Sequence, residues 1–145
     1  MKLSALYQIF LDCAVVTTDS RNCPAGSLFI ALKGESFNGN AFAAQALKDG
    51  CAYAIVDEAE YAPENNRHII LVDNCLQTLQ QLANYHRRQL GTKVIGITGT
   101  NGKTTTKELI SAVLSKSHNV LYTEGNLNNH IGVPMTCLLY TSDAA

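Results

Sequence analysis

A glycine-rich loop between an apolar run and an amphipathic pattern constrains this chain more than any other feature. Residues 93–98 read KVIGIT, a short β-branched run of the kind that forms a buried strand. Apolar residues from Leu109 to Leu114 then recur at helical spacing, which predicts a helix that begins near Lys103. The sequence between them, TGTNGKTT (98–105), therefore joins a predicted strand to the N-terminus of a predicted helix.

This context is the one that a phosphate-binding loop needs. Gly99 and Gly102 allow positive φ angles and a close approach of an anion, and the helix N-terminus offers unpaired N–H groups. Lys103 can reach β- and γ-phosphates, and the Thr104 hydroxyl can bind a magnesium ion. The general pattern asks for glycine where this chain has Ile97, so a glycine turn without a ligand stays the alternative. The predicted phosphate site consists of Gly99, Thr100, Asn101, Gly102, Lys103, Thr104 and Thr105.

Composition limits the size and class of the protein. The chain has 145 residues, enough for one ordinary domain or for a small domain plus part of another. Its apolar content of 46% and charged content of 16% predict a packed core rather than disorder. A net charge of −1 gives no support for binding to nucleic acid or to an anionic membrane. No apolar run approaches the roughly 20 residues of a membrane span, and residues 1–13 predict an amphipathic helix rather than a signal peptide.

Cysteine and histidine usage favours neither disulfides nor a metal site. The five cysteines are odd in number and widely spaced, and no Cys-x-x-Cys occurs. We therefore expect free thiols in a reducing cytoplasm. The four histidines are scattered along the chain and are interpreted as surface or packing residues.

The first ninety residues have the pattern of an α/β domain. Buried strands are predicted at 27–32, 52–56 and 68–72, and helices at 41–50 and 75–90. The polar stretch between the last two strands predicts an exposed connection. We place a domain junction at Gly91-Thr92, which gives domains 1–91 and 92–145. The second is expected to be the incomplete start of a parallel-sheet ATPase domain, ordered strand, phosphate loop, helix and a strand at 119–123.

Three further stretches are candidates for binding. The first, TTDSRNCPAGSLFIALKG (17–34), contains Asp-Ser-Arg before a turn, which a surface ion pair explains about as well as a ligand does. The second, KGESFNGNAF (33–42), is a glycine-bearing loop that an ordinary strand–helix connection also explains. The third, YTEGNLNNHIGVPMT (122–136), is interpreted as a polar loop with many hydrogen-bonding groups.

Together with TGTNGKTT, these stretches resemble the Mur ligases, which build the peptide of peptidoglycan, over about residues 17–136. The resemblance implies that the first domain binds the uridine end of a UDP-sugar-peptide. Ser20 and Arg21 would lie at the uracil and its pyrophosphate, and the loop Gly34 to Gly39 would close over the nucleotide. The family often has Asp-Gly-His where this chain has Asn-Gly-Asn. The implied substrate contacts are Ser20, Arg21, Gly34, Glu35, Ser36, Asn38, Gly39, Asn126 and Asn129.

The resemblance also implies an activity. In this family ATP and Mg²⁺ drive amide-bond formation through an acyl phosphate. Lys103 would be the catalytic residue that stabilises the transferring phosphoryl group, and Thr104 would hold the metal. The loop GNLNNHIGVPMT is most similar to that of the family member that joins D-alanyl-D-alanine to UDP-MurNAc-tripeptide. Alternatives are the member that adds the third peptide residue, and a nucleotide-binding module without catalysis.

The resemblance further implies that the chain is the N-terminal part of a cytoplasmic, monomeric ligase. The ending LYTSDAA departs from the family pattern, and the later segments that the family uses for adenine and for the incoming amino compound are not found. We therefore expect the 145-residue chain by itself to be inactive.

Overall fold

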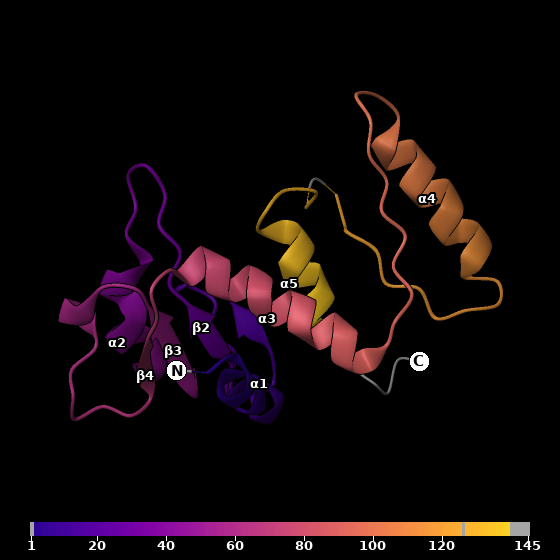
Figure 1. Ribbon diagram of the computed structural model, residues 1–145. Coiled ribbons are helices and arrows are strands. Elements are labelled where there is room, and N and C mark those ends of the chain that lie inside the picture. The colour runs from indigo at the N-terminus through magenta and orange to yellow at the C-terminus, as the bar shows by residue number, and fades with distance from the viewer. Residues whose placement is uncertain (1, 126, 140–145) are drawn as a thin grey trace. The chain divides into compact units, whose positions relative to one another are not determined.

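A parallel β-sheet forms the centre of the first half of the chain. The computed structural model describes residues 2–125 and 127–139, and these divide into two compact units, Met1–Leu82 and Ala83–Ala145. The first unit contains a four-stranded sheet in the order β1-β2-β3-β4, with every neighbouring pair parallel (Figure 1). Its strands are β1 (Val16–Thr17), β2 (Leu28–Ile30), β3 (Tyr53–Val56) and β4 (Ile69–Leu71).

The two central strands are buried on both faces, as expected for parallel strands covered by helices. Every residue of β2 is fully buried, and so are Ala54, Ile55 and Val56 in β3. The register places Phe29 beside Ala54 and Ile55 beside Ile70, so apolar residues lie next to one another across the sheet. These continuous apolar runs are the feature that predicted three of the strands from sequence. The two-residue strand β1 was not predicted.

The α-helices of the first unit lie before β1, between β2 and β3, and after β4. Helix α1 (Leu3–Asp12) precedes the sheet, as predicted, and buries Leu6, Tyr7 and Phe10. The connection from β2 to β3 contains the 3₁₀ turn η1 (Gly39–Phe42) and helix α2 (Ala43–Lys48), which packs against β3. The connection from β3 to β4 is largely exposed and contains only the 3₁₀ turn η2 (Ala59–Tyr61). Helix α3 (Cys75–Leu90) follows β4 and has the predicted bounds.

Local chemistry explains both ends of α3. The Asn74 side-chain oxygen accepts a hydrogen bond from the Gln77 N–H at 2.8 Å, the arrangement of an N-cap. Buried residues recur along the helix at the spacing of one face, at Cys75, Leu79 and Leu82. Gly91 takes a φ of 63° directly after the last helical residue, the conformation in which glycine ends helices.

The second unit is helical. It contains the rest of α3, helix α4 (Lys103–Leu114) and helix α5 (Gly132–Leu138). Helix α4 begins at the predicted residue. Helix α5 was predicted as loop, because the segment before it is rich in asparagine and the helix itself contains Gly132 and Pro134. Pro134 is tolerated because it lies in the first turn, where its missing N–H has no intrahelical acceptor.

Two predicted strands of this unit are not strands in the structure. Residues 93–98 and 119–123 are irregular, and neither pairs with any other segment in the part of the chain that the structure describes. Val94 and Ile95 remain about 60% and 61% exposed. A β-branched run indicates strand propensity, but a strand forms only where a neighbouring strand accepts and donates its backbone hydrogen bonds.

The α/β class and the parallel sheet are therefore confirmed, whereas the predicted junction at Gly91-Thr92 remains a prediction.

Among the described residues, no helix combines the length and the apolar character needed to cross a membrane.

Candidate nucleotide sites

The carboxyl ends of the parallel strands meet at one edge of the sheet, the usual position of ligand sites in such folds. Thr18 to Arg21 follow β1, the loop of residues 33–42 follows β2, and Asp57 follows β3. Two of the predicted substrate stretches therefore lie at the same edge. They surround a hollow of about 450 Å³ lined by Thr18, Asp19, Ser20, Arg21, Phe37 and Phe42. We refer to it as the edge pocket.

Asp19 shapes the β1 side of the edge pocket. Its carboxylate accepts hydrogen bonds from the Arg21 backbone N–H at 3.0 Å and from the Arg21 Nε and Nη2 atoms, both at 2.9 Å. The Thr17 hydroxyl, two residues before Asp19 and at the end of β1, donates to the Asn22 carbonyl at 2.9 Å and closes the turn. The Arg21 side chain is 87% exposed, so its guanidinium remains accessible from solvent. Ser20 stands between the two charged residues.

The ion pair lowers the pKa of Asp19 to about 2, through the side-chain hydrogen bonds from Arg21 first and its backbone N–H second. Because folding lowers the pKa of Asp19, the ion pair stabilises the folded chain at pH values above the ordinary pKa of 3.8. This stabilisation is lost as the pH falls toward about 2.

We expect Arg21→Ala to raise the pKa of Asp19 toward 3.8, measured by NMR titration of the carboxyl carbon. The exposed Arg67→Ala should leave this pKa unchanged, and an unchanged value in Arg21→Ala would contradict the assigned pair.

The loop of residues 33–42 forms the other wall of the edge pocket. Gly34 N–H donates to the Phe37 carbonyl at 2.8 Å, and Lys33 and Asn38 form an antiparallel bridge, so the loop is a tight turn. Gly34, Glu35 and Ser36 are exposed at its tip. Gly39 is buried against Leu32, and no room exists there for a side chain.

Asn38 is largely occupied by contacts within the protein. Its side-chain oxygen accepts from the Asn40 N–H at 3.0 Å and from Asn40 Nδ2 at 2.9 Å, and its Nδ2 donates to Glu58 at 2.8 Å. Asn38 and Gly39 thus hold the loop in shape. The exposed tip is the part of the loop that is accessible to a ligand.

Sequence reasoning missed two aromatic residues of the edge pocket. The rings of Phe37 and Phe42 stack with centroids 5.3 Å apart and an interplanar angle of 13°, and the residues are 45% and 39% exposed. Half-exposed aromatic faces beside polar groups are suited to stacking on a flat ring. The two phenylalanines lie on either side of an Asn-Gly-Asn turn, where a core residue is not expected. This position was the feature of the sequence that could have indicated them.

The predicted phosphate loop lies in the second unit and begins α4. Gly99 and Gly102 take φ angles of 148° and 76°, and a Cβ atom added to Gly102 would meet nothing within 4 Å. The first intrahelical bond runs from Thr106 N–H to the Gly102 carbonyl at 2.9 Å, so the N–H groups of the preceding three residues have no acceptor within the helix. The Lys103 ammonium donates to the Gly99 carbonyl across the loop.

This donor set fits a polyphosphate. An ammonium group, open glycine backbone and a helix N-terminus face the same loop, and Thr104 and Thr105 carry exposed hydroxyls. No group of three or more His, Cys, Asp or Glu side chains gathers elsewhere in the described residues to hold a metal ion. The loop thus has the chemistry of an anion site, and the Thr104 hydroxyl is an accessible oxygen for a hydrated cation.

A second lysine, which sequence reasoning did not single out, connects α4 to the segment of residues 122–136. Lys107 Nζ donates to the Thr123 carbonyl at 2.5 Å and lies 5.7 Å from the centroid of the Tyr122 ring. Of the two predicted substrate asparagines there, Asn126 lies outside the described residues. The Asn129 side-chain oxygen accepts from the N–H groups of Ile131 and Gly132 at 3.1 and 2.7 Å, so it caps the start of α5.

Comparison with known proteins identifies the class to which this fold and these loops belong. Residues 13–87 match the profile described as the Mur ligase family, catalytic domain, and residues 97–145 match the Mur ligase middle domain. The chain belongs to the Mur ligase family.

Two of the similar relatives in this family carry the same enzyme name. The chain is 50% identical over 123 residues to the UDP-N-acetylmuramoyl-tripeptide–D-alanyl-D-alanine ligase of Bacillus subtilis, covering 85% of this chain and 27% of that protein. The enzyme of the same name in Escherichia coli is 41% identical over 128 residues, covering 88% of this chain and 28% of that protein.

Solved structures agree with these relatives. A crystal structure of MurF from Acinetobacter baumannii matches with a TM-score of 0.82 and 36% identity over 97% of this chain and 33% of that chain. MurF ligase from Thermotoga maritima in complex with ADP matches with a TM-score of 0.79 and 32% identity over 89% of this chain and 29% of that chain. The chain thus spans about a quarter to a third of the length of the relatives it matches.

Proposed function

We propose that this chain forms part of an ATP-dependent ligase that joins D-alanyl-D-alanine to UDP-MurNAc-tripeptide in peptidoglycan synthesis. The observation that carries the proposal is the 50% identity, over 85% of this chain, to a ligase of that name. Residues 1–91 would form the UDP-binding domain and residues 92–145 the beginning of the ATP-binding domain. The protein would act in the cytoplasm as a monomer.

In the first unit, the edge pocket would hold the uridine diphosphate end of the substrate. Arg21 supplies an exposed guanidinium that is already oriented by Asp19, and guanidinium groups bind phosphate oxygens in a bidentate manner. Phe37 and Phe42 offer ring faces for the uracil, and the Ser20 hydroxyl a hydrogen bond. Gly34, Glu35 and Ser36 would contact the nucleotide from the tip of the loop, with Asn38 and Gly39 fixing that tip.

In the second unit, the phosphate loop would hold ATP and Mg²⁺. ATP supplies the phosphoryl group that activates the substrate carboxylate for attack by the amino group of the dipeptide. Gly99 to Thr105 would surround the phosphates with backbone N–H groups, and the Thr104 hydroxyl would bind the cation. The Lys103 ammonium would leave the Gly99 carbonyl and neutralise charge on the transferring group. Asn126 and Asn129 would position the substrate.

For the 145-residue chain alone we propose nucleotide binding without ligation. The apolar side chains of Leu109 and Val113 on α4 are 64% and 69% exposed, and the segment before the phosphate loop is unpaired. Catalysis by positioning requires reacting groups that are held rigidly, and a loop without such support does not provide this.

A titration of UDP into the 145-residue chain tests the edge pocket. We expect the amide signals of Thr18, Ser20, Arg21 and the loop of residues 33–42 to shift in NMR spectra. Arg21→Ala should weaken binding, and Arg67→Ala, which removes an exposed guanidinium elsewhere in the same unit, should not. Shifts confined to other surfaces would contradict the proposed site.

A further inference from the structure

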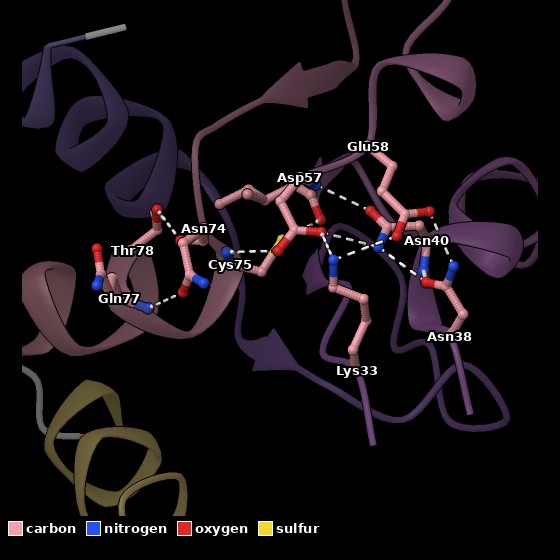
Figure 2. A network of polar contacts seen from close by, with 10 residues as sticks. Lys33, Asn38, Asn40, Asp57, Glu58, Asn74, Cys75, Gln77 and Thr78 are labelled. Carbon is pink, nitrogen blue, oxygen red and sulfur yellow. Dashed lines mark hydrogen bonds and ion pairs between the residues drawn. The ribbon is translucent and has the colours of Figure 1, made fainter. Parts of the chain in front are cut away.

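A buried carboxylate lies at the centre of the contacts that hold the loop of residues 33–42 (Figure 2). Asp57 comes directly after β3, and its side chain is only 5% exposed. One carboxylate oxygen accepts from Lys33 Nζ at 3.0 Å and from Asn40 Nδ2 at 2.9 Å. The other accepts from the Cys75 N–H at 3.1 Å, in the first turn of α3. Asp57 therefore joins the loop to the N-terminus of α3.

Asn40 and Glu58 complete the network. The Asp57 N–H donates to the Asn40 side-chain oxygen at 2.9 Å, so Asp57 and the fully buried Asn40 are joined by a pair of hydrogen bonds. Glu58 accepts from Lys33 at 3.2 Å and from Asn38 at 2.8 Å. In Figure 2 the Lys33 side chain reaches up toward Asp57, and Asn38 and Asn40 lie to the right of Lys33.

These contacts fix both ends of the turn that carries a wall of the edge pocket. Lys33 comes immediately before the exposed tip, Asn38 comes immediately after Phe37, and Asn40 follows two residues later. Phe37 stacks on Phe42, and both line the pocket. The position of the aromatic pair therefore depends on where the two ends of the turn are held.

Lys33 and Asp57 each stabilise the charged form of the other. Burial raises the pKa of Asp57, but hydrogen bonds from the Cys75 N–H, Lys33 and Asn40 outweigh it and hold that pKa below its usual value. Hydrogen bonds to Asp57 and then to Glu58 raise the pKa of Lys33. Asp57 is thus ionised at neutral pH, and every group that its carboxylate contacts is a donor.

We propose that Asp57 is a positioning residue of the edge pocket, which holds the aromatic wall of the pocket in its binding shape by anchoring Lys33 and Asn40 to the sheet edge and to α3. The inference rests on the proposed function only in taking UDP as the ligand of the pocket. Nothing in it requires Asp57 to touch that ligand.

Asp57→Asn is the decisive substitution, because it preserves size and removes one acceptor. Both carboxylate oxygens face donors, so whichever way the amide turns, its NH₂ group meets another donor. We expect the amide signals of residues 34–37 and the contact between the Phe37 and Phe42 rings to change in NMR spectra of the ligand-free chain. The amide signals of the β2 residues should not change. UDP affinity should fall on the order of tenfold, the scale of losing a hydrogen bond to a charged group.

Two more variants separate positioning from general destabilisation. Ile55→Val removes one buried methylene from the same strand without touching the network, and should change neither the loop signals nor UDP affinity. Lys33→Met keeps the aliphatic stem, removes the ammonium, and should change the same loop signals to a smaller extent. If Asp57→Asn does not fold, the loop signals of Lys33→Met test whether the network positions the loop.

The outcomes distinguish this inference from the proposed function. Unchanged loop signals in a folded Asp57→Asn chain, or in Lys33→Met where Asp57→Asn does not fold, would overturn the inference. An unchanged UDP affinity of Asp57→Asn would also overturn the inference, provided that the parent chain binds UDP. A parent chain that binds no UDP would contradict the proposed function, and the loop signals alone would then decide whether Asp57 positions the loop.

Discussion

Lys103→Ala is expected to lower the rate of ligation by about 10²–10³-fold in a full-length ligase that carries this sequence, while leaving the fold intact. The ammonium group lies across the phosphate loop, where it donates to the Gly99 carbonyl, and is not part of the core. In the reaction it would be directed at charge that develops on the transferring phosphoryl group. Its loss therefore removes an interaction with the transition state rather than packing.

The measurement is phosphate release and ligation with saturating ATP, with thermal unfolding followed in parallel. Lys116→Ala is a matched control, because this exposed lysine lies just beyond the end of the same helix. The control should retain the parent rate. A Lys103→Ala enzyme with the parent rate, or one that does not fold, would show that this loop is not the phosphate site.

Element positions in the first unit could be predicted from sequence because local and tertiary preferences agree there. The apolar runs around Phe29, Ile55 and Ile70 form parallel strands, of which the two central ones are covered on both faces. Helix α3 has both a capping Asn74 and a terminal Gly91. The similar run at residues 93–98 does not form a strand, and no strand among the described residues pairs with it. A strand is stabilised by its partners, whereas a capped helix carries most of its signals within itself.

The candidate sites were predictable as motifs but not as contacts. Stretches around Ser20 and Gly34 were expected to bind one ligand, and the structure brings them to one pocket. The aromatic wall and Asp57 were not expected. Asp57 reaches Asn40 and Cys75 across separations of 17 and 18 residues, and no local pattern indicates contacts between residues that only the sheet topology brings together.

Gly39→Ala is expected to cause the largest loss of stability among the substitutions considered, about 1–3 kcal/mol of unfolding free energy. A Cβ atom at this position would lie 2.5 Å from the Leu32 carbonyl oxygen, 2.9 Å from the Leu32 nitrogen and 3.0 Å from the Ala31 carbonyl carbon. All three are backbone atoms at the end of β2, so a side-chain rotation cannot relieve the clash. The loop must move away from the strand, and the Gly39 N–H bond to the Leu32 carbonyl weakens with it.

Gly34→Ala, five residues earlier in the same loop, is the matched control, because a Cβ atom there meets nothing within 4 Å. Its unfolding free energy should stay within about 0.5 kcal/mol of the parent. Urea denaturation of the three chains measures both effects. UDP titration of Gly39→Ala beside the parent chain adds a second comparison, since this substitution displaces the turn that carries Phe37 and should weaken binding as well. Equal stabilities for the two variants would mean that the close packing of Gly39 on Leu32 does not hold this loop to the sheet.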